Sequence, residues 1–304
     1  MSFSDEAYSQ SCSLVLEDVK IDLARQTRAE RRKERRRRIE QLRANPNLAT
    51  TSSQSITLDN SLEEENSSTD RFMDLELCRA ATKDDADGFI DALERISKEK
   101  KLPLPAIFEQ VSPFGNTYLH IAASFNNCKT VLLIVDLAPW LLSKKNSKGD
   151  TVLHILARAG YQHTVLGLVL NLEHYEHSSF GNGYKPESES ATLRAQNEEG
   201  NNVLHEALIH EHKVLANFLL LEFVKLDPEA LYDLNKEEKS ALYLATEAGF
   251  IGCVNHSLAK IIEYENQFGK LKGKSPVHAA IIKRNTGMLL LTFPFTFKKK
   301  FLQN

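Results

Sequence analysis

The chain has 304 residues, of which 42% are hydrophobic and 26% are charged, a composition typical of a soluble globular protein. Its net charge of −3 excludes a polycation, although residues 25–43 hold ten Arg and Lys residues against three Glu residues. Four widely spaced cysteines argue against a disulfide framework or a zinc ribbon, and the lack of a run of about 18 apolar residues argues against a membrane-spanning helix.

Residues 1–70 are predicted to form a disordered arm that carries one basic helix at residues 23–43. Arg, Glu, Gln and Ala in that segment favour a helix, whereas residues 47–70 hold few large apolar side chains. Three interpretations of the basic helix stay open: a nuclear localisation signal read by import machinery, a patch for nucleic acid or an anionic membrane surface, and a solvated helix without a dedicated role. Its candidate residues are Arg31, Arg32, Lys33, Arg35, Arg36, Arg37 and Arg38.

A short phrase recurs along the rest of the chain. It reads TYLHIAA (117–123), TVLHILA (151–157), NVLHEAL (202–208), SALYLAT (240–246) and SPVHAA (275–280). Its histidine, or Tyr243, recurs after 34, 51, 38 and 35 residues, a period that indicates stacked repeats. The phrase resembles T-P-L-H-x-A, the signature of ankyrin repeats, and a degenerate copy surrounds Leu77. We therefore predict an all-α ankyrin-repeat solenoid of about six repeats at residues 71–288.

Each repeat is predicted to hold a glycine-containing turn and two helices. The first helix starts at Thr, Ser or Asn, which are natural N-caps, and ends at a residue suited to the left-handed conformation, such as Asn126, Gly160 or Gly249. The second helix is more apolar. The predicted core residues are Leu77, Ala80, Leu119, Ala122, Leu132, Leu133, Leu153, Ala157, Leu166, Leu204, Ala207, Leu219, Leu242, Ala245, Val277 and Ala280.

Two segments depart from the repeat pattern. The step of 51 residues predicts a loop insertion at residues 174–199, which are rich in Gly, Ser and carboxylates. Residues 289–304 form an atypical tail, because Pro294 forbids a continuous helix there. The insertion is interpreted either as part of a binding face or as a neutral surface loop.

No pattern in the chain predicts catalysis, a cofactor or a metal site. The repeated histidines are expected to bond to the backbone of an adjacent turn rather than to a metal, and His174 and His177 have no clearly spaced Cys or carboxylate partners. Residues 269–275 (GKLKGKS) have three residues between the glycines, where a phosphate-binding loop needs four. We therefore expect no enzyme activity and no small-molecule substrate.

Three phrases are more particular than the general ankyrin signature: NEEGNNVLHEA (197–207), SALYLATEAGF (240–250) and SPVHAAIIKRN (275–285). They resemble the plant ankyrin proteins of the accelerated-cell-death-like group, which carry a C-terminal PGG domain. The resemblance covers residues 71–288 and implies an ankyrin array followed, in full-length members, by membrane-spanning helices. This chain departs from the group at about Met288, as if truncated before the PGG domain.

The resemblance implies a non-catalytic scaffold for protein–protein interaction in plant stress or defence signalling. Partners are expected along the concave ankyrin face, and the chain itself is expected to be cytoplasmic or nuclear, whereas full-length members are membrane-associated. Two alternatives remain: a nuclear regulatory factor that uses the basic arm, and a soluble fragment of a membrane-bound signalling protein. The candidate partner-binding residues at the turn tips are Asn146, Lys148, Gln196, Glu198, Lys236 and Glu238.

Overall fold

The computed structural model describes residues 30, 33–41, 73–172, 188–250, 274, 276–284 and 287, although not the side chains of 276–278. The chain divides into two compact units, Met1–Thr50 and Thr51–Asn304. In the first unit, residues 30 and 33–41 are helical, within the predicted helix 23–43. The rest of that helix, residues 42–70 of the arm, the first part of the insertion (174–187) and the tail 289–304 lie outside the described residues.

The described part of the second unit is built from short helices. It contains no strand, only isolated bridge residues such as Leu234 and Ser240, so the predicted all-α class is confirmed. The helices are α2 (Leu75–Ala81), α3 (Ala86–Lys100), α4 (Leu104–Phe108), α5 (Tyr118–Ser124), α6 (Cys128–Leu137), η3 (Pro139–Leu142), α7 (Val152–Arg158), α8 (Gln162–Val169), α10 (Glu189–Arg194), α11 (Val203–Ile209), α12 (Lys213–Leu226), η4 (Pro228–Tyr232), α13 (Ala241–Glu247) and α15 (Pro276–Ile282).

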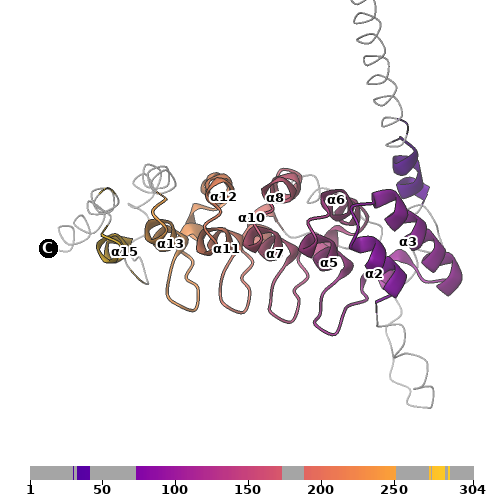
Figure 1. Ribbon diagram of the computed structural model, residues 1–304, viewed down its shortest axis with the longest axis horizontal. Coiled ribbons are helices and arrows are strands. Elements are labelled where there is room, and N and C mark those ends of the chain that lie inside the picture. The colour runs from indigo at the N-terminus through magenta and orange to yellow at the C-terminus, as the bar shows by residue number, and fades with distance from the viewer. Residues whose placement is uncertain are drawn as a thin grey trace, which may run out of the picture. The chain divides into compact units, whose positions relative to one another are not determined.

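The helices of the second unit follow one another in a row. The first helix of each repeat packs against the first helix of the next, in the order α2, α5, α7, α11, α13 and α15. The second helices α3, α6, α8 and α12 pack on them and on one another. The turns that precede α5, α7, α11 and α13 extend to one side of this row, and α6, α8 and α12 lie on the other side (Figure 1).

Local chemistry accounts for where the first helices begin and end. Thr117, Thr151, Asn202 and Ser240 are the N-caps of α5, α7, α11 and α13, and each has an extended backbone. After the helices, the backbone turns left-handed at Asn126, Gly160, Glu211 and Gly249, with φ between 56° and 74°. The predicted caps and ends are therefore confirmed, with Glu211 taking the place of the expected Gly or Asn.

Most of the predicted core is buried, but three of its residues are only half-buried: Ala80, Leu132 and Leu166. The neighbouring residues Ala81, Val131 and Val165 are fully buried instead. In α2 and α6 the predicted core residues Leu77 and Leu133 are buried, so the prediction misplaced single positions and not the whole buried stripe. Leu132 lies at the junction of α6 and α8, where its methyl groups face Gly167. The side chain of Val277 is outside the described part.

The predicted loop insertion 174–199 is wrong in its second half. Residues 189–194 form α10, which occupies the place that η3 and η4 hold in other repeats. Leu142, Leu193 and Leu231 each lie four residues before the asparagine that opens the next turn, and each is buried. Residues 188–199 are thus the regular connector, and any extra chain of this repeat lies before residue 188.

Candidate partner-binding surface

Each turn is organised by an asparagine at its start. The Oδ1 atoms of Asn146, Asn197 and Asn235 accept hydrogen bonds from the backbone N–H groups two and four residues later, at 2.9–3.0 Å. Each side-chain amide then reaches the preceding turn: Asn146 donates to Asn116 at 2.9 Å, and Asn235 donates to Asn201 at 3.0 Å. These asparagines therefore hold both their own turn and its spacing from the neighbouring turn.

The repeated histidines tie each first helix to the next turn. His120, His154 and His205 accept a hydrogen bond at Nδ1 from the backbone N–H of their N-cap residue, at 3.2, 3.1 and 3.4 Å. The ring proton therefore resides on Nε2. From there it is donated to the carbonyl oxygens of Asp150, Asn201 and Lys239, at 2.9, 2.8 and 3.3 Å.

Burial of these histidines disfavours their charged form. It lowers the pKa of His120 and of His154, and it lowers the pKa of His205 to about 4. The imidazoles are thus neutral cross-links between repeats, and the bond to an adjacent turn that the sequence predicted for four histidines is confirmed for these three. The side chain of His278 lies outside the described part.

The turn tips are joined by backbone hydrogen bonds. The N–H groups of Ser147, Glu198 and Lys236 donate to the carbonyl oxygens of the preceding tips, at Phe114, Lys148 and Glu199, with lengths of 2.9–3.0 Å. A further bond of 2.9 Å joins the N–H of Lys274 to the carbonyl of Glu238. The tips therefore form one continuous edge whose side chains are spaced by the repeats.

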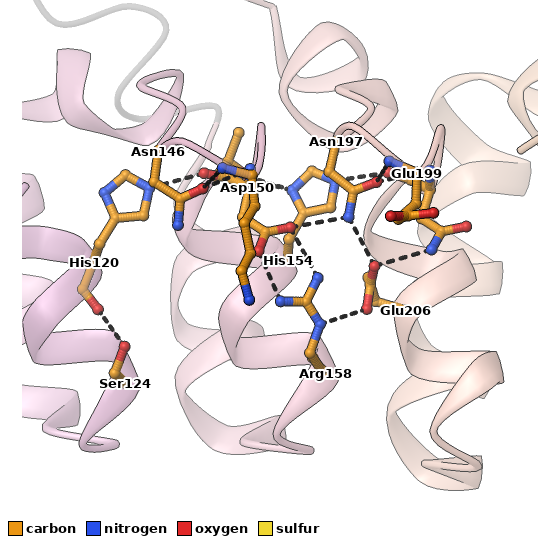
Figure 2. A network of polar contacts seen from close by, with 12 residues as sticks. His120, Ser124, Asn146, Asp150, His154, Arg158, Asn197, Glu199 and Glu206 are labelled. Carbon is orange, nitrogen blue, oxygen red and sulfur yellow. Dashed lines mark hydrogen bonds and ion pairs between the residues drawn. The ribbon is translucent and has the colours of Figure 1, made fainter. Parts of the chain in front are cut away.

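Arg158 on α7 is the centre of a polar network at the base of this edge (Figure 2). Its guanidinium donates two hydrogen bonds to Asp150, at 2.7 and 2.8 Å, and one to Glu206 on α11, at 2.9 Å. Asn197 donates to both carboxylates at 2.9 Å, and Asn201 donates to Glu206 at 3.1 Å. The network joins two turns to two first helices.

The carboxylates of this network are ionised despite their burial. Burial raises the pKa of a carboxyl group, but the hydrogen bonds from Arg158 and Asn197 outweigh it and hold the pKa of Asp150 below its ordinary value. The same balance lowers the pKa of Glu206, with Arg158 as its strongest partner. The two carboxylates in turn raise the pKa of Arg158. The cluster is thus a satisfied structural network and has no group left over for chemistry.

An ion pair with exchanged charges occupies the equivalent positions two repeats later. Lys239 at the base of its turn donates to Glu247 on α13 at 3.1 Å, as Arg158 on α7 donates to Asp150. The final residues of α7 and α13 therefore face the bases of their own turns. We define the turn-side face as the exposed turn tips together with the first-helix residues Ser124, Arg158, Ile209 and Glu247 and their neighbours Ile121, Phe125 and Ile155.

The turn-side face exposes large apolar side chains. Phe125 at the end of α5 is 59% exposed, Ile209 at the end of α11 is 41% exposed, and Phe114 at the first turn tip is 70% exposed. Ile121 on α5 and Ile155 on α7 are half-buried. Exposed large apolar side chains can mark an interaction site.

The structure separates the six candidate residues of the turn tips into two groups. Lys148, Glu198, Lys236 and Glu238 are exposed on adjacent tips. Asn146 and Gln196 are half-buried and already engaged: Asn146 holds its turn, and Gln196 donates to the carbonyl of Leu234 at 3.4 Å. These two residues therefore support the turns and are poor candidates for contact with a partner.

Phe114, Phe125, Arg158 and Ile209 were missed in the sequence. A signal for three of them was present, because the two positions after the constant phrase differ in each repeat: Ser124 and Phe125, Arg158 and Ala159, Ile209 and His210. Positions that vary while their neighbours stay constant are typical of a recognition surface on a repeated scaffold.

The described residues contain no group of three His, Cys, Asp or Glu side chains placed to hold a metal ion. None of their helices is both long enough and apolar enough to cross a bilayer. His174, His177, the glycine-rich segment 269–273, and Arg31 and Arg32 of the basic arm lie outside the described residues, whereas Lys33, Arg36 and Arg37 are exposed on their helix.

Comparison with known proteins finds a distant relation. No family model matches the chain. The chain is similar to Protein ACCELERATED CELL DEATH 6 of Arabidopsis thaliana, with 27% identity over 186 residues, which cover 58% of this chain and 27% of that protein. The chain therefore spans about a quarter of the length of the curated relative it matches. The name of this relative is that of the plant group that the three repeated phrases resemble.

Proposed function

We propose that the chain is a non-catalytic ankyrin-repeat scaffold of about six repeats that binds other proteins on its turn-side face. The regular use of N-cap, histidine and asparagine in successive repeats supports the ankyrin assignment, together with the distant relation to ACCELERATED CELL DEATH 6. In such arrays each repeat is stabilised by its neighbours, and the face formed by turns and first helices is available to a partner.

The observation that carries the binding proposal is the exposure of Phe125 and Ile209 at equivalent ends of first helices. Packing among the repeats does not require these side chains, because the buried residues Leu119, Leu153 and Leu204 already fill the interior. Exposed apolar residues beside a row of polar tips provide the apolar centre and polar rim of a protein interface.

A role in plant stress or defence signalling is part of the proposal. It is supported by the name and the plant source of the relative. Because the match covers 27% of that protein, its activities and partners are not transferred as a whole.

The experiment is a quantitative pull-down from plant extract with the full chain as bait. The test variant replaces Phe125 and Ile209 by Ser. The matched control replaces Leu170 and Val214 by Ser, since Leu170, the C-cap of α8, is 65% exposed and Val214 on α12 is 67% exposed. The proposal requires proteins that the wild type and the control retain and the test variant loses, while all three chains show the same circular dichroism. Equal retention by the test variant would refute the turn-side face as the binding site.

A second candidate function, a nuclear factor that uses the basic arm, is favoured by one observation: Lys33, Arg36 and Arg37 are exposed on one helix. Such a cluster suits import machinery or an anionic surface. Deletion of residues 25–43 in a fluorescent fusion tests it. A fusion that is nuclear with and without the segment, or that is never nuclear, excludes this function.

A further inference from the structure

The charges of the turn-side face are divided along the row of repeats. Exposed lysines occupy the first half, and no ion pair within the described part of the chain engages them: Lys144, Lys145 and Lys148. The ammonium of Lys145 donates to the carbonyl of Gln196 at 2.7 Å. Carboxylates dominate the second half: Glu198, Glu199, Glu237, Glu238 and Glu247, with Lys236, Lys239 and Lys274 among them. Lys239 pairs with Glu237 at 3.0 Å and with Glu247 at 3.1 Å. Three positive charges therefore face one half, and five carboxylates less three lysines leave two negative charges on the other half.

The division lies between two adjacent turns. The N–H of Glu198 donates to the carbonyl of Lys148 at 3.0 Å, so the last basic tip and the first acidic tip are direct neighbours. Their side chains nevertheless form no ion pair with each other in the structure, and both are exposed. Because these opposite charges are adjacent but not paired with each other, both can interact with charged groups of a binding partner.

Apolar contacts lie on both sides of this division. Phe125, the C-cap of α5, lies in the basic half and Ile209 on α11 in the acidic half, and α7 with the half-buried Ile155 packs between α5 and α11. A partner bound along the row of repeats can thus bury apolar groups in each half, while its charged groups pair with the charged side chains of the turn tips.

We propose that the turn-side face selects a bipolar polypeptide segment, with carboxylates against the turn of Lys144 and Lys148 and with cations against the turns of Glu198 and Glu237. This inference rests on the proposed function and adds the chemistry of the partner to it. Electrostatic complementarity sets specificity and register at an interface, and like charges placed opposite each other are strongly disfavoured. Nucleic acid and an anionic lipid surface fit poorly, because their uniform negative charge would meet the acidic half.

The geometry sets the spacing of charges in the partner. Neighbouring helices pack about 8–10 Å apart, so the distance from the basic turn to the last acidic turn, two repeats on, is about 20 Å. An extended segment spans this distance with about six residues, and a helical segment spans it with about 13 residues. The acidic and basic groups of the partner should therefore be separated by about that number of positions.

The test is selection of a random 16-residue peptide library on phage against the full chain. We expect enriched peptides to hold Asp or Glu in one half and Lys or Arg in the other, around large apolar residues. The enriched peptides are then synthesised, and their dissociation constants are measured by fluorescence polarisation against the wild type and against a variant with Lys144→Glu and Lys148→Glu. We expect this variant to bind about tenfold or more weakly, which corresponds to about 1.4 kcal/mol.

Two further measurements make the result specific. A peptide whose acidic residues are changed to Lys should bind the Lys144→Glu, Lys148→Glu variant better than it binds the wild type. A matched control with Lys98→Glu and Lys225→Glu, two exposed lysines on α3 and α12, should bind the original peptide as the wild type does.

The outcomes separate this inference from the proposed function. Peptides that lose affinity when Phe125 and Ile209 are replaced by Ser, but show no charge division, would overturn the bipolar partner and leave the binding face in place. Peptides that bind all variants equally, or the absence of any enriched peptide, would contradict the proposed function as well.

Discussion

Replacing Arg158 by Met is the sharpest test of how the repeats are held together. Met keeps much of the aliphatic length of the arginine and removes its charge and its donors. The change leaves Asp150 and Glu206 without their cation, and the side chains of these two carboxylates are only 2% and 3% exposed. The three lost hydrogen bonds measure 2.7, 2.8 and 2.9 Å.

The expected destabilisation is large because two buried charges lose one partner. Removal of one member of a buried ion pair costs about 3–5 kcal/mol. The Arg158 side chain is 34% exposed, which lets some water reach the vacated position, so we expect the free energy of unfolding to fall by about 3–4 kcal/mol. Arg194→Met is the matched control: the Arg194 side chain is 39% exposed, and those of its partners Asp227 and Asp233 are each 20% exposed. For the control we expect a loss of about 1 kcal/mol.

The assay is urea unfolding followed by circular dichroism and by the fluorescence of Trp140, the single tryptophan, which is 8% exposed. The stability of the Arg158→Met variant should also depend on pH differently from that of the wild type. Without Arg158, burial and mutual repulsion raise the pKa of Asp150 and Glu206 above the unfolded values, so the stability of the variant should rise as the pH falls from 7 to 5 relative to the wild type. An Arg158→Met variant as stable as the wild type, or one less affected than Arg194→Met, would refute the structural role of the network.

Three further outcomes follow from single side chains. Leu153→Ala should lower the free energy of unfolding by about 2–5 kcal/mol because Leu153 is fully buried, and an unchanged urea midpoint would contradict its position in the core. Asn202→Thr should raise thermal stability by about 1 kcal/mol, since the side-chain amide of Asn202 is buried without a hydrogen-bond partner and equivalent helices start with Thr; an unchanged or lower melting temperature would contradict this account. The pKa of His205 is lowered to about 4, so its contribution to stability is present above pH 6.5 and is lost as the pH falls toward 4. The His205→Gln variant should therefore lose less stability between pH 6.5 and 5, by up to about 1.4 kcal/mol per pH unit, and a slope equal to that of the wild type would contradict the buried neutral imidazole.

The parts of the fold that the sequence predicted well are those decided within a few residues of the chain. Thr117 caps α5 and Gly160 follows α7 in a left-handed conformation because these residue types satisfy the backbone at those points, whatever their neighbours. Single core positions were less secure: Leu132 and Leu166 look like core residues but are half-buried, whereas their neighbours Val131 and Val165 are fully buried.

The candidate site was harder to predict because its members come together only in the stack. Arg158 and Glu206 are 48 residues apart in the sequence and on either side of the predicted insertion. Nothing local distinguishes Arg158 from a solvated arginine, and its partners are known only when the register of α7 against α11 is known. The same holds for Asn146, which looks like a free polar tip and is engaged in its turn and in the preceding one.

The amino-acid sequence by itself determines the repeated unit of this protein: two short helices, their caps and a turn, with a neutral histidine that bonds across to the next turn. The caps and turns depend on hydrogen bonds between residues close in the chain, and the histidine recurs at a fixed place in each unit, so these features can be read from residue types and spacing. Only the tertiary structure decides which side chains meet between repeats and which remain exposed on the turn-side face. That outcome depends on how successive helices pack, because contact between distant residues is set by the shape and register of the whole stack.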